Sequence, residues 1–301
     1  MREPPLIRLL PDGRRVHLHD GPIDLILEAW GQPAAVRAAH RAAAARMNGL
    51  LDELCEELAI LRAPVGPLSP VPIGLVATRM RAAVLPYAAD GFITPMAAVA
   101  GAVAEAVLAA MVAAAPLDRA YVNNGGDIAL HLAAGESFTT GLIDRPDRPS
   151  LIGQALIRAE DGVRGIATSG WHGRSFSLGI ADAVTILARE AADADAAATI
   201  VANAVDLDHP GIVRVPADSL DPNSDLGARL VTRDVPALTA AEQDRALESG
   251  LLRAAGLIAA GRIVAASLHL QGVTRTIGAF AASPLAMIRQ ETEPVRRMSH
   301  A

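Results

Sequence analysis

The chain has very few cysteine and aromatic residues. Cys55 is the single cysteine among 301 residues, so no disulfide can form within the chain and no metal site can be built from several thiolates. Because free cysteine is among the most buried residue types, we expect the thiol of Cys55 to be buried in its helical segment, LLDELCEELAIL. Aromatic residues are 3% of the chain although 51% is hydrophobic, which predicts a core of Ala, Val, Leu and Ile.

An excess of positive charge is also missing. The 27 Lys and Arg residues are outnumbered by 33 Asp and Glu, which gives a net charge of −6 and argues against binding to nucleic acid or to anionic lipid. The N-terminus lacks the long apolar run of a secretory signal. The most apolar stretch, Met96–Leu117, contains Glu105 and is expected to be a buried helix rather than a membrane span. We therefore expect a cytoplasmic protein with no nucleic-acid or membrane partner; a homo-oligomer is left open.

Short segments bounded by Gly, Pro, Asn and Asp predict many strands. The tripeptide Pro11-Asp12-Gly13 predicts an N-terminal hairpin, because proline presets φ and glycine supplies a positive φ. The expected strands are Leu6–Leu10, Arg14–Leu18, Ile23–Ala29, Ala120–Asn123, Ile128–Leu132, Phe138–Ile143, Leu151–Arg158, Val163–Ala167, Ser175–Leu178, Ala183–Leu187, Ile263–Gln271 and Val273–Ile277.

Alanine-rich stretches predict helices between these strands. The expected helices are Pro33–Leu61, one starting within Leu75–Tyr87, one opening at the N-cap Thr94, Ala191–Val205, and Thr239–Gly261 with a capping box formed by Thr239 and Glu242. The segment Asp206–Val235 is expected to be mainly loop. The pattern predicts an α+β fold, a mostly antiparallel sheet packed by long Ala-rich helices. We expect one domain over 1–290, with a candidate sub-boundary near 63–72, and a frayed tail over 291–301.

The first motif that could bind a ligand is Asn123-Asn124-Gly125-Gly126-Asp127, which lies between two expected strands. Two glycines allow backbone geometry closed to other residues and leave N–H groups open to a phosphate. Asp127 could bind a ribose hydroxyl or position a metal. The candidate ligand-binding residues here are Asn124, Gly125, Gly126 and Asp127; the alternative is an ordinary β-turn.

The second motif is Gly165-Ile166-Ala167-Thr168-Ser169-Gly170, followed by Trp171-His172-Gly173-Arg174. A strand ends here in a turn whose amides, carbonyls and hydroxyls suit a phosphate or a metal, and the spacing of a nucleophile elbow is absent. The candidate binding residues are Thr168, Ser169, Gly170 and Arg174. The alternative is that His172 and Arg174 are an ordinary loop histidine and a surface charge.

The third motif is Asp193-Ala194-Asp195-Ala196-Ala197-Ala198-Thr199. On a helix Asp195 and Thr199 lie four residues apart on one face, which Asn203 continues. A carboxylate with a hydroxyl suits a hard cation such as Mg²⁺. The alternative is a plain helix start, with Asp193 as the cap.

Taken together and in this order, the three motifs resemble those of the ApbE family of FAD:protein FMN transferases, which carry Gly-Gly-Asp, Ala-Thr-Ser-Gly and Asp-Ala-x-Ala-Thr. The resemblance covers about eighty residues well. It implies an ApbE-like, T-fold-like architecture, an FAD or FMN ligand, and a divalent cation such as Mg²⁺. That cation would be held by Asp195, Thr199 and the main-chain carbonyl of Ala167. It also implies transfer of FMN to a Ser or Thr of an acceptor protein, with the metal neutralising phosphate charge.

The chain departs from these transferases between the second and third motifs. Their His-Ile-Ile-Asp-Pro-x-Thr-Gly segment is replaced by FSLGIADAVT over 176–185, as in an ApbE-related cytoplasmic branch that lacks the His segment. Asp182 stands near the place of that Asp, and His172 is the candidate substitute for the catalytic His. Three hypotheses stay open: a flavin transferase, a non-catalytic flavin- or nucleotide-binding protein, and another small-molecule enzyme that uses His172, Arg174 and Asp182, joined by Asp144 and Arg145.

Overall fold

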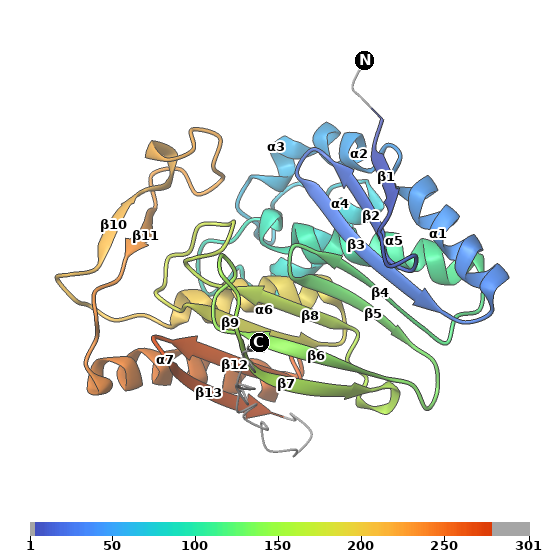
Figure 1. Cartoon of the computed structure of the whole chain (residues 1–301). Helices are drawn as coiled ribbons and strands as arrows, with labels where there is room; N and C mark the ends of the chain where they lie inside the picture. The colour runs from blue at the N-terminus through green and yellow to red at the C-terminus, as the bar shows by residue number, and fades with distance from the viewer. Residues whose placement is uncertain (1–3, 279–301) are drawn as a thin grey trace, which may run out of the picture.

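The computed structural model describes residues 4–278 and confirms an α+β fold (Figure 1). Every strand pair in the described residues is antiparallel. Nine strands form the main sheet, in the order β1 (Leu6–Leu9), β2 (Val16–Asp20), β3 (Ile23–Trp30), β4 (Arg119–Asn124), β5 (Asp127–Leu132), β8 (Gly165–Ser169), β9 (Ala183–Ala188), β12 (Ala265–Leu270) and β13 (Val273–Gly278).

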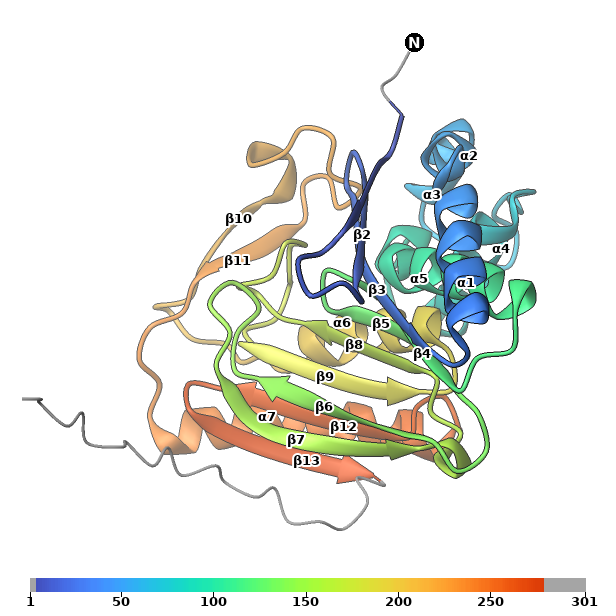
Figure 2. The same cartoon turned by 45° about the vertical axis from the view of Figure 1, so that its right-hand side comes forward.

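Helices cover one face of this sheet, and a hairpin of β6 (Ser137–Ile143) and β7 (Leu151–Arg158) lies over the other (Figure 2). The main core lies under the helices, and a smaller one, which includes Leu130 and Ile157, lies under the hairpin. The helices are α1 (Pro33–Met47), α2 (Leu50–Glu56), α3 (Leu58–Leu61), α4 (Leu75–Val84), α5 (Val99–Ala114), α6 (Ala191–Ala204) and α7 (Ala240–Ala259). Short 3₁₀ turns occupy Leu85–Tyr87, Pro95–Ala98, Ala159–Asp161 and Ala217–Ser219.

Small residues bring the helices and the sheet into backbone contact. A Cβ added at Gly101 of α5 would lie 2.2 Å from the carbonyl oxygen of Ala191, at the start of α6. A Cβ at Gly165 of β8 would lie 2.2 Å from the carbonyl oxygen of Glu190. These two glycines fix the N-terminus of α6 against both α5 and β8, and this places the third motif beside the first two.

The alanine-rich helix α5 is part of the core. The stretch Pro95–Ala114 is long and apolar enough to cross a membrane by length and composition, with a mean hydropathy of 2.0 over its most apolar window. Its α5 part packs against α1, α6, β4 and β5. One such helix, packed in this way, is compatible with a soluble protein.

The first expected helix, Pro33–Leu61, was wrong as a single element. It is divided into α1, α2 and α3, because Gly49 adopts a left-handed φ of 78° and Glu57 leaves helical geometry. Cys55 is exposed rather than buried. Leu50 and Leu54 occupy the core-facing side of α2, and the next residue is turned about 100° away from Leu54.

One strand assignment was also wrong. Ser175–Leu178 forms no strand, because the Oδ1 atom of Asn203 accepts hydrogen bonds from Ser177 Oγ and Leu178 N and holds this segment as a connection. The segment Asp206–Val235 is rich in loops, as expected, and it also contains the two-stranded ribbon β10 (Val213–Pro216) and β11 (Leu230–Asp234).

Thr94 lies at the expected N-cap position, but its side chain does not make the expected capping hydrogen bond. Thr94 precedes the 3₁₀ turn that leads into α5, yet its hydroxyl donates to Asp225 instead of accepting from the helix. The capping box of Thr239 and Glu242 is confirmed at the start of α7. The single-domain assignment and the sub-boundary near 63–72 stay predictions, and the tail over 291–301 lies outside the described residues.

Candidate functional site

The three motifs meet at one cavity of about 470 Å³. β4 and β5 carry the first motif, β8 lies beside β5 and carries the second, and α6 packs on β8 and β9 and carries the third. The start of α5 closes the cavity with Val99, Ala100 and Val103. The residues of the three motifs and their flanks that line it are Asn124, Gly125, Asp127, Thr168, Ser169, Gly170, His172, Gly173, Arg174, Ser175, Asp195 and Thr199.

Two carboxylates form the floor of this cavity. Asp127 Oδ1 accepts from the backbone N–H of Thr168 at 3.3 Å, and Asp195 Oδ2 accepts from the backbone N–H of Gly101 at 3.0 Å. Burial raises the pKa of Asp127 to about 7, against the opposing effects of the Thr168 N–H and the Arg174 charge. Burial, reinforced by the negative charge of Asp127, raises the pKa of Asp195 well above its ordinary value. A nearby positive charge would therefore favour the ionised form of both carboxylates.

The donor set fits a divalent cation. Asp127, Asp195 and the hydroxyl of Thr199 are all hard oxygen donors in one cavity, which is the ligand type that Mg²⁺ takes in proteins. Arg174 is the only Lys or Arg among the residues lining the cavity, and it is exposed. A cation bound between the carboxylates would satisfy them and would offset the charge of an incoming phosphate.

The glycine turn shapes the rim of the cavity. Gly125 and Gly126 adopt φ values of 67° and 116°, and the backbone N–H of Gly126 donates to Asn123 Oδ1 at 2.8 Å. Gly126 does not line the cavity, so its role is to close the turn. The Asn124 side chain donates to the carbonyl of Ala100 at 3.2 Å and ties the turn to α5.

The structure does not bring Ala167 into the cavity. Ala167 is fully buried in β8, opposite Ile186 of β9, and is not among the lining residues. The N–H of Thr168 points toward Asp127, and in a trans peptide the carbonyl of the preceding residue points the opposite way. The expected main-chain ligand is therefore not placed beside Asp127.

Two further expectations for the third motif are corrected. The helix begins at Ala191 with Glu190 as N-cap, so Asp193 lies in the first turn and is not the cap. Asn203 does not share the cavity with Asp195 and Thr199, because its side chain is bound to the segment that contains Ser177 and Leu178.

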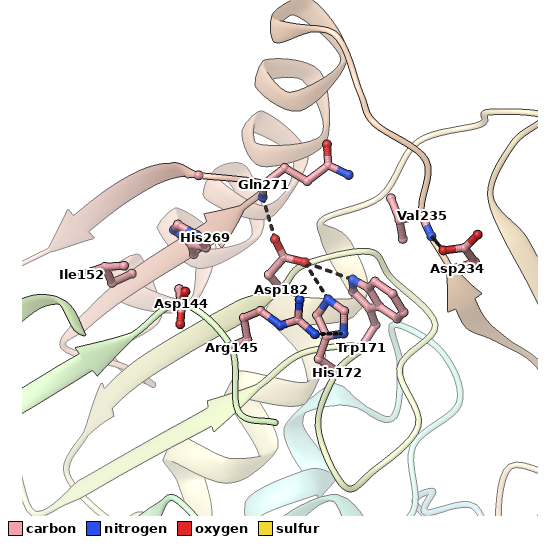
Figure 3. A pocket seen from close by; sticks show the side chains of 11 residues that line it. Asp144, Arg145, Ile152, Trp171, His172, Asp182, Asp234, Val235, His269 and Gln271 are labelled. Atoms are coloured by element: carbon pink, nitrogen blue, oxygen red, sulfur yellow. Dashed lines mark hydrogen bonds and ion pairs between the residues drawn. The ribbon is translucent and has the colours of Figure 1, made fainter. Parts of the chain in front are cut away.

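A second cavity, of about 600 Å³, adjoins the first, and His172 lines both (Figure 3). Its other lining residues come from the ends of β6, β11 and β12, from the start of β7 and from the segment after β8; they are Asp144, Arg145, Ile152, Trp171, Asp182, Asp234, Val235, His269, Gln271 and Gly272. Asp182 connects several of these residues, because it accepts hydrogen bonds from Trp171 Nε1 at 3.1 Å and from the backbone N–H of Gln271 at 2.6 Å.

His172 lies between a carboxylate and a guanidinium. Its Nε2 is 3.3 Å from Asp182 Oδ1, and its Nδ1 is 3.2 Å from Arg145 Nη2 (Figure 3). A guanidinium can only donate, so Nδ1 accepts and Nε2 carries the proton toward Asp182. Burial and the Arg145 charge lower the pKa of His172, although Asp182 opposes this, and the lowered pKa favours the neutral ring.

The second cavity contains residues that sequence spacing did not single out. Trp171, His269 and Gln271 surround Asp182 but come from three separate segments. Burial lowers the pKa of His269. The sequence offered one local signal, because Gln271 precedes Gly272 in a two-residue turn. In the structure Gln271 is the only non-glycine residue with a positive φ in the described chain. The function of this turn, to aim an N–H at Asp182, needs the fold to be seen.

The family model described as "AbpE bacteria" matches residues 7–276. A UPF0280 protein of Methanopyrus kandleri is 44% identical over 125 residues, 41% of this chain and 48% of its own length. UPF0280 proteins of Methanothrix thermoacetophila and Methanoregula boonei are 42% and 38% identical, over 37% and 45% of this chain and 46% and 55% of their own lengths. The chain thus spans about half the length of these curated relatives.

The family match covers nearly all of the part of the chain that the structure describes, from β1 to β13, and includes all three motifs. It is consistent with an ApbE-related protein. By its match from residue 7 to residue 276, the chain belongs to the family described as "AbpE bacteria".

Proposed function

We propose that the chain binds FAD or FMN together with Mg²⁺ in the cavity formed by the three motifs, and that it transfers FMN from FAD to a hydroxyl of an acceptor protein. The observation that carries this proposal is the pair of carboxylates, Asp127 and Asp195, placed beside the Thr199 hydroxyl under a rim of glycine and hydroxyl residues. A pyrophosphate needs hydroxyl and amide donors and a cation, and this cavity offers both kinds of partner.

In this reaction the phosphorus–oxygen bond between FMN and AMP breaks, and a bond forms between the FMN phosphorus and the acceptor oxygen. AMP leaves with the bridging oxygen, and the acceptor hydroxyl loses its proton. Bound Mg²⁺ would supply neutralisation of the phosphate charge. Arg174, at the rim beside Gly125, would add a second positive charge on the phosphate side.

His172 is suited to take the acceptor proton. Its lowered pKa favours the neutral ring, it lies at the junction of the two cavities, and Asp182 would stabilise the imidazolium through Nε2. The proton would go to Nδ1, which requires Arg145 to leave that atom when the substrates bind. His172 and Asp182 would therefore do the work of the His segment that family transferases carry elsewhere.

The hydrogen bond from Arg145 to Nδ1 also favours a second candidate function, a non-catalytic flavin- or nucleotide-binding protein. In this alternative Arg145 keeps His172 occupied and FAD stays intact.

We also infer a cytoplasmic location, which the single cysteine supports, because secreted domains commonly use disulfides.

Incubation with FAD and Mg²⁺ separates the two functions. Chromatography would follow AMP, and in-gel fluorescence would follow flavinylated protein in the presence of a Ser- or Thr-containing acceptor. Release of AMP that requires Mg²⁺ and is lost in His172→Gln supports the transferase. Mg²⁺-dependent FAD binding without AMP contradicts the transferase and supports the binding protein; absence of FAD binding contradicts both. His131→Gln is the control, because His131 contacts the carbonyl of Leu117 and lines neither cavity.

A further inference from the structure

Two histidines and one aspartate cluster on the N-terminal hairpin, away from both cavities. His17 and His19 lie on β2 and Asp24 on β3, and one ligand atom from each lies within 4.8 Å of the other two. His17 Nε2 is 2.6 Å from Asp24 Oδ1, and the two imidazole centroids are 6.1 Å apart. The His17 and Asp24 side chains are 25% and 48% exposed, so a solvated ion can reach them.

The register of the sheet produces this cluster. Residues two apart on a strand share a face, so His17 and His19 project together while Val16 and Leu18 fill the core. His19 pairs directly with Asp24 across the ladder, and His17 reaches the same carboxylate along the diagonal. The three side chains are therefore positioned by backbone pairing and not by a mobile loop.

The cluster lies on the face opposite to the flavin cavity. Ile23 is buried, packs in the core under the helices and lines the cavity, and the next residue on the strand, Asp24, points to the other face. Figure 2 shows that β2 and β3 turn this second face away from α1 and α5. The cluster is thus separate from the Asp127 and Asp195 pair.

We propose that His17, His19 and Asp24 form a site for a borderline divalent cation, with Zn²⁺ as the best fit. Two imidazoles and one carboxylate are the ligand set of open zinc sites, in which solvent or another molecule takes the fourth position. Zinc bonds of about 2.0–2.1 Å place tetrahedral ligands roughly 3.3 Å apart, which half-exposed side chains reach by small rotations. Mg²⁺ prefers oxygen ligands and is a poor match for two imidazoles.

The charged groups around the cluster permit this occupant. Arg8 of β1 pairs with His17 across the ladder on the same face, and it is exposed and able to extend into solvent. Ile26 pairs with His17 on the other side, and Leu6 pairs with His19. The competing explanation is a plain hydrogen-bonded pair between His17 and Asp24, in which His19 has no part. His19 is accordingly the residue that separates the two explanations.

The test is a calorimetric titration of metal-stripped, untagged full-length protein with ZnCl₂, repeated with MgCl₂. We expect one Zn²⁺ per chain at this site and a loss of affinity of roughly tenfold or more in His19→Ala and in Asp24→Asn, since even outer partners of a metal site are worth that much. His209→Ala is the matched control, because His209 faces a single carboxylate, that of Glu242, and should leave the affinity unchanged.

A Co²⁺ titration gives a second readout, because visible absorption bands of tetrahedral Co²⁺ should appear in wild type and disappear in His19→Ala. Zinc binding that His19→Ala leaves intact would overturn the proposal, and so would no zinc binding by wild type. Circular dichroism of each variant checks that the fold is kept. Since flavin and Mg²⁺ take no part in this titration, its outcome is independent of the transferase assay.

Discussion

Burial, together with the negative charge of Asp127, raises the pKa of Asp195 in the first cavity, although Asp127 begins a strand and Asp195 lies in the second turn of a helix. Folding thus brings together two like charges that the chain could have kept apart. Such an arrangement costs stability when both groups ionise without a partner, and it is typical of sites that bind a cation.

The approach of α6 to α5 should depend on the absence of a side chain at Gly101. We expect Gly101→Ala to lower the free energy of unfolding by about 1–3 kcal/mol, because its Cβ would meet the backbone of Ala191 and Ala192. Gly256→Ala on α7 is the control; nothing lies within 4 Å of its added Cβ, so a gain of up to about 1 kcal/mol is expected. Urea unfolding measures both, and an unchanged midpoint in Gly101→Ala would contradict the packing.

The state of His172 should respond to Arg145. We expect Arg145→Gln to raise the pKa of His172, because it removes a positive charge beside Nδ1 and leaves Asp182 in place. Histidine NMR titration of the two proteins measures this shift. Arg148→Gln, an exposed arginine in the same connection, should leave the His172 titration unchanged. Equal pKa values in wild type and Arg145→Gln would show that the contact is not maintained in solution.

The lowered pKa of His172 and His269 sets the sign of the contribution that these two groups make to the acid response. Below the unfolded value of about 6.5, the unfolded chain binds these protons more readily than the folded chain. Their contribution to stability should therefore be fully present above that pH and decline as pH falls below it, whereas the raised pKa of Asp127 acts in the opposite direction. The difference in urea midpoint between Arg145→Gln and wild type, followed from about pH 7.5 to about pH 5.5, isolates the contribution of His172. It should move in favour of Arg145→Gln as pH falls, and a movement in favour of wild type would contradict the assignment.

Catalysis and binding should separate at the second cavity. We expect His172→Gln to lower the rate of FMN transfer by about 100-fold or more, the usual contribution of a general base, while the Kd for FAD stays the same. Asp182→Asn should lower kcat as well, because the amide cannot stabilise the imidazolium as a carboxylate does. Steady-state kinetics together with FAD binding decide this; a loss confined to FAD affinity would place His172 in binding alone.

The sequence predicted most of the frame because its signals are local. The capping box at Thr239, the glycine turn at Gly125 and the alternation of strand residues each depend on neighbours within a few positions. The misses arise where a distant side chain decides. Asn203 binds Leu178 and holds the segment Ser175–Leu178 as a connection instead of a strand. Asp225 accepts a hydrogen bond from the Thr94 hydroxyl, which was expected to cap α5.

The candidate site was likewise predicted where its signals are local and missed where they are not. Most of the candidate residues in the three motifs line the first cavity, because each motif carries its own turn or helix face. Gly126 and Ala167 do not line it, and the residues from the start of α5 were not predicted. The exclusion of Ala167 could not be predicted, since it depends on which side of β8 the carbonyl faces. The surroundings of Asp182 were hidden as well, because Trp171, His269 and Gln271 become neighbours only through the sheet order β8, β9, β12.

The most direct measurement for the central claim is a calorimetric titration of FMN into the protein, with Mg²⁺ and with EDTA. Asp195→Asn is compared with Asp193→Asn, which changes a carboxylate on the same helix that does not line the cavity. We expect wild type and Asp193→Asn to bind FMN only with Mg²⁺, and Asp195→Asn to lose roughly 10–100-fold in affinity. FMN binding that is equal in EDTA, or equal in Asp195→Asn and wild type, would contradict a metal-dependent flavin site.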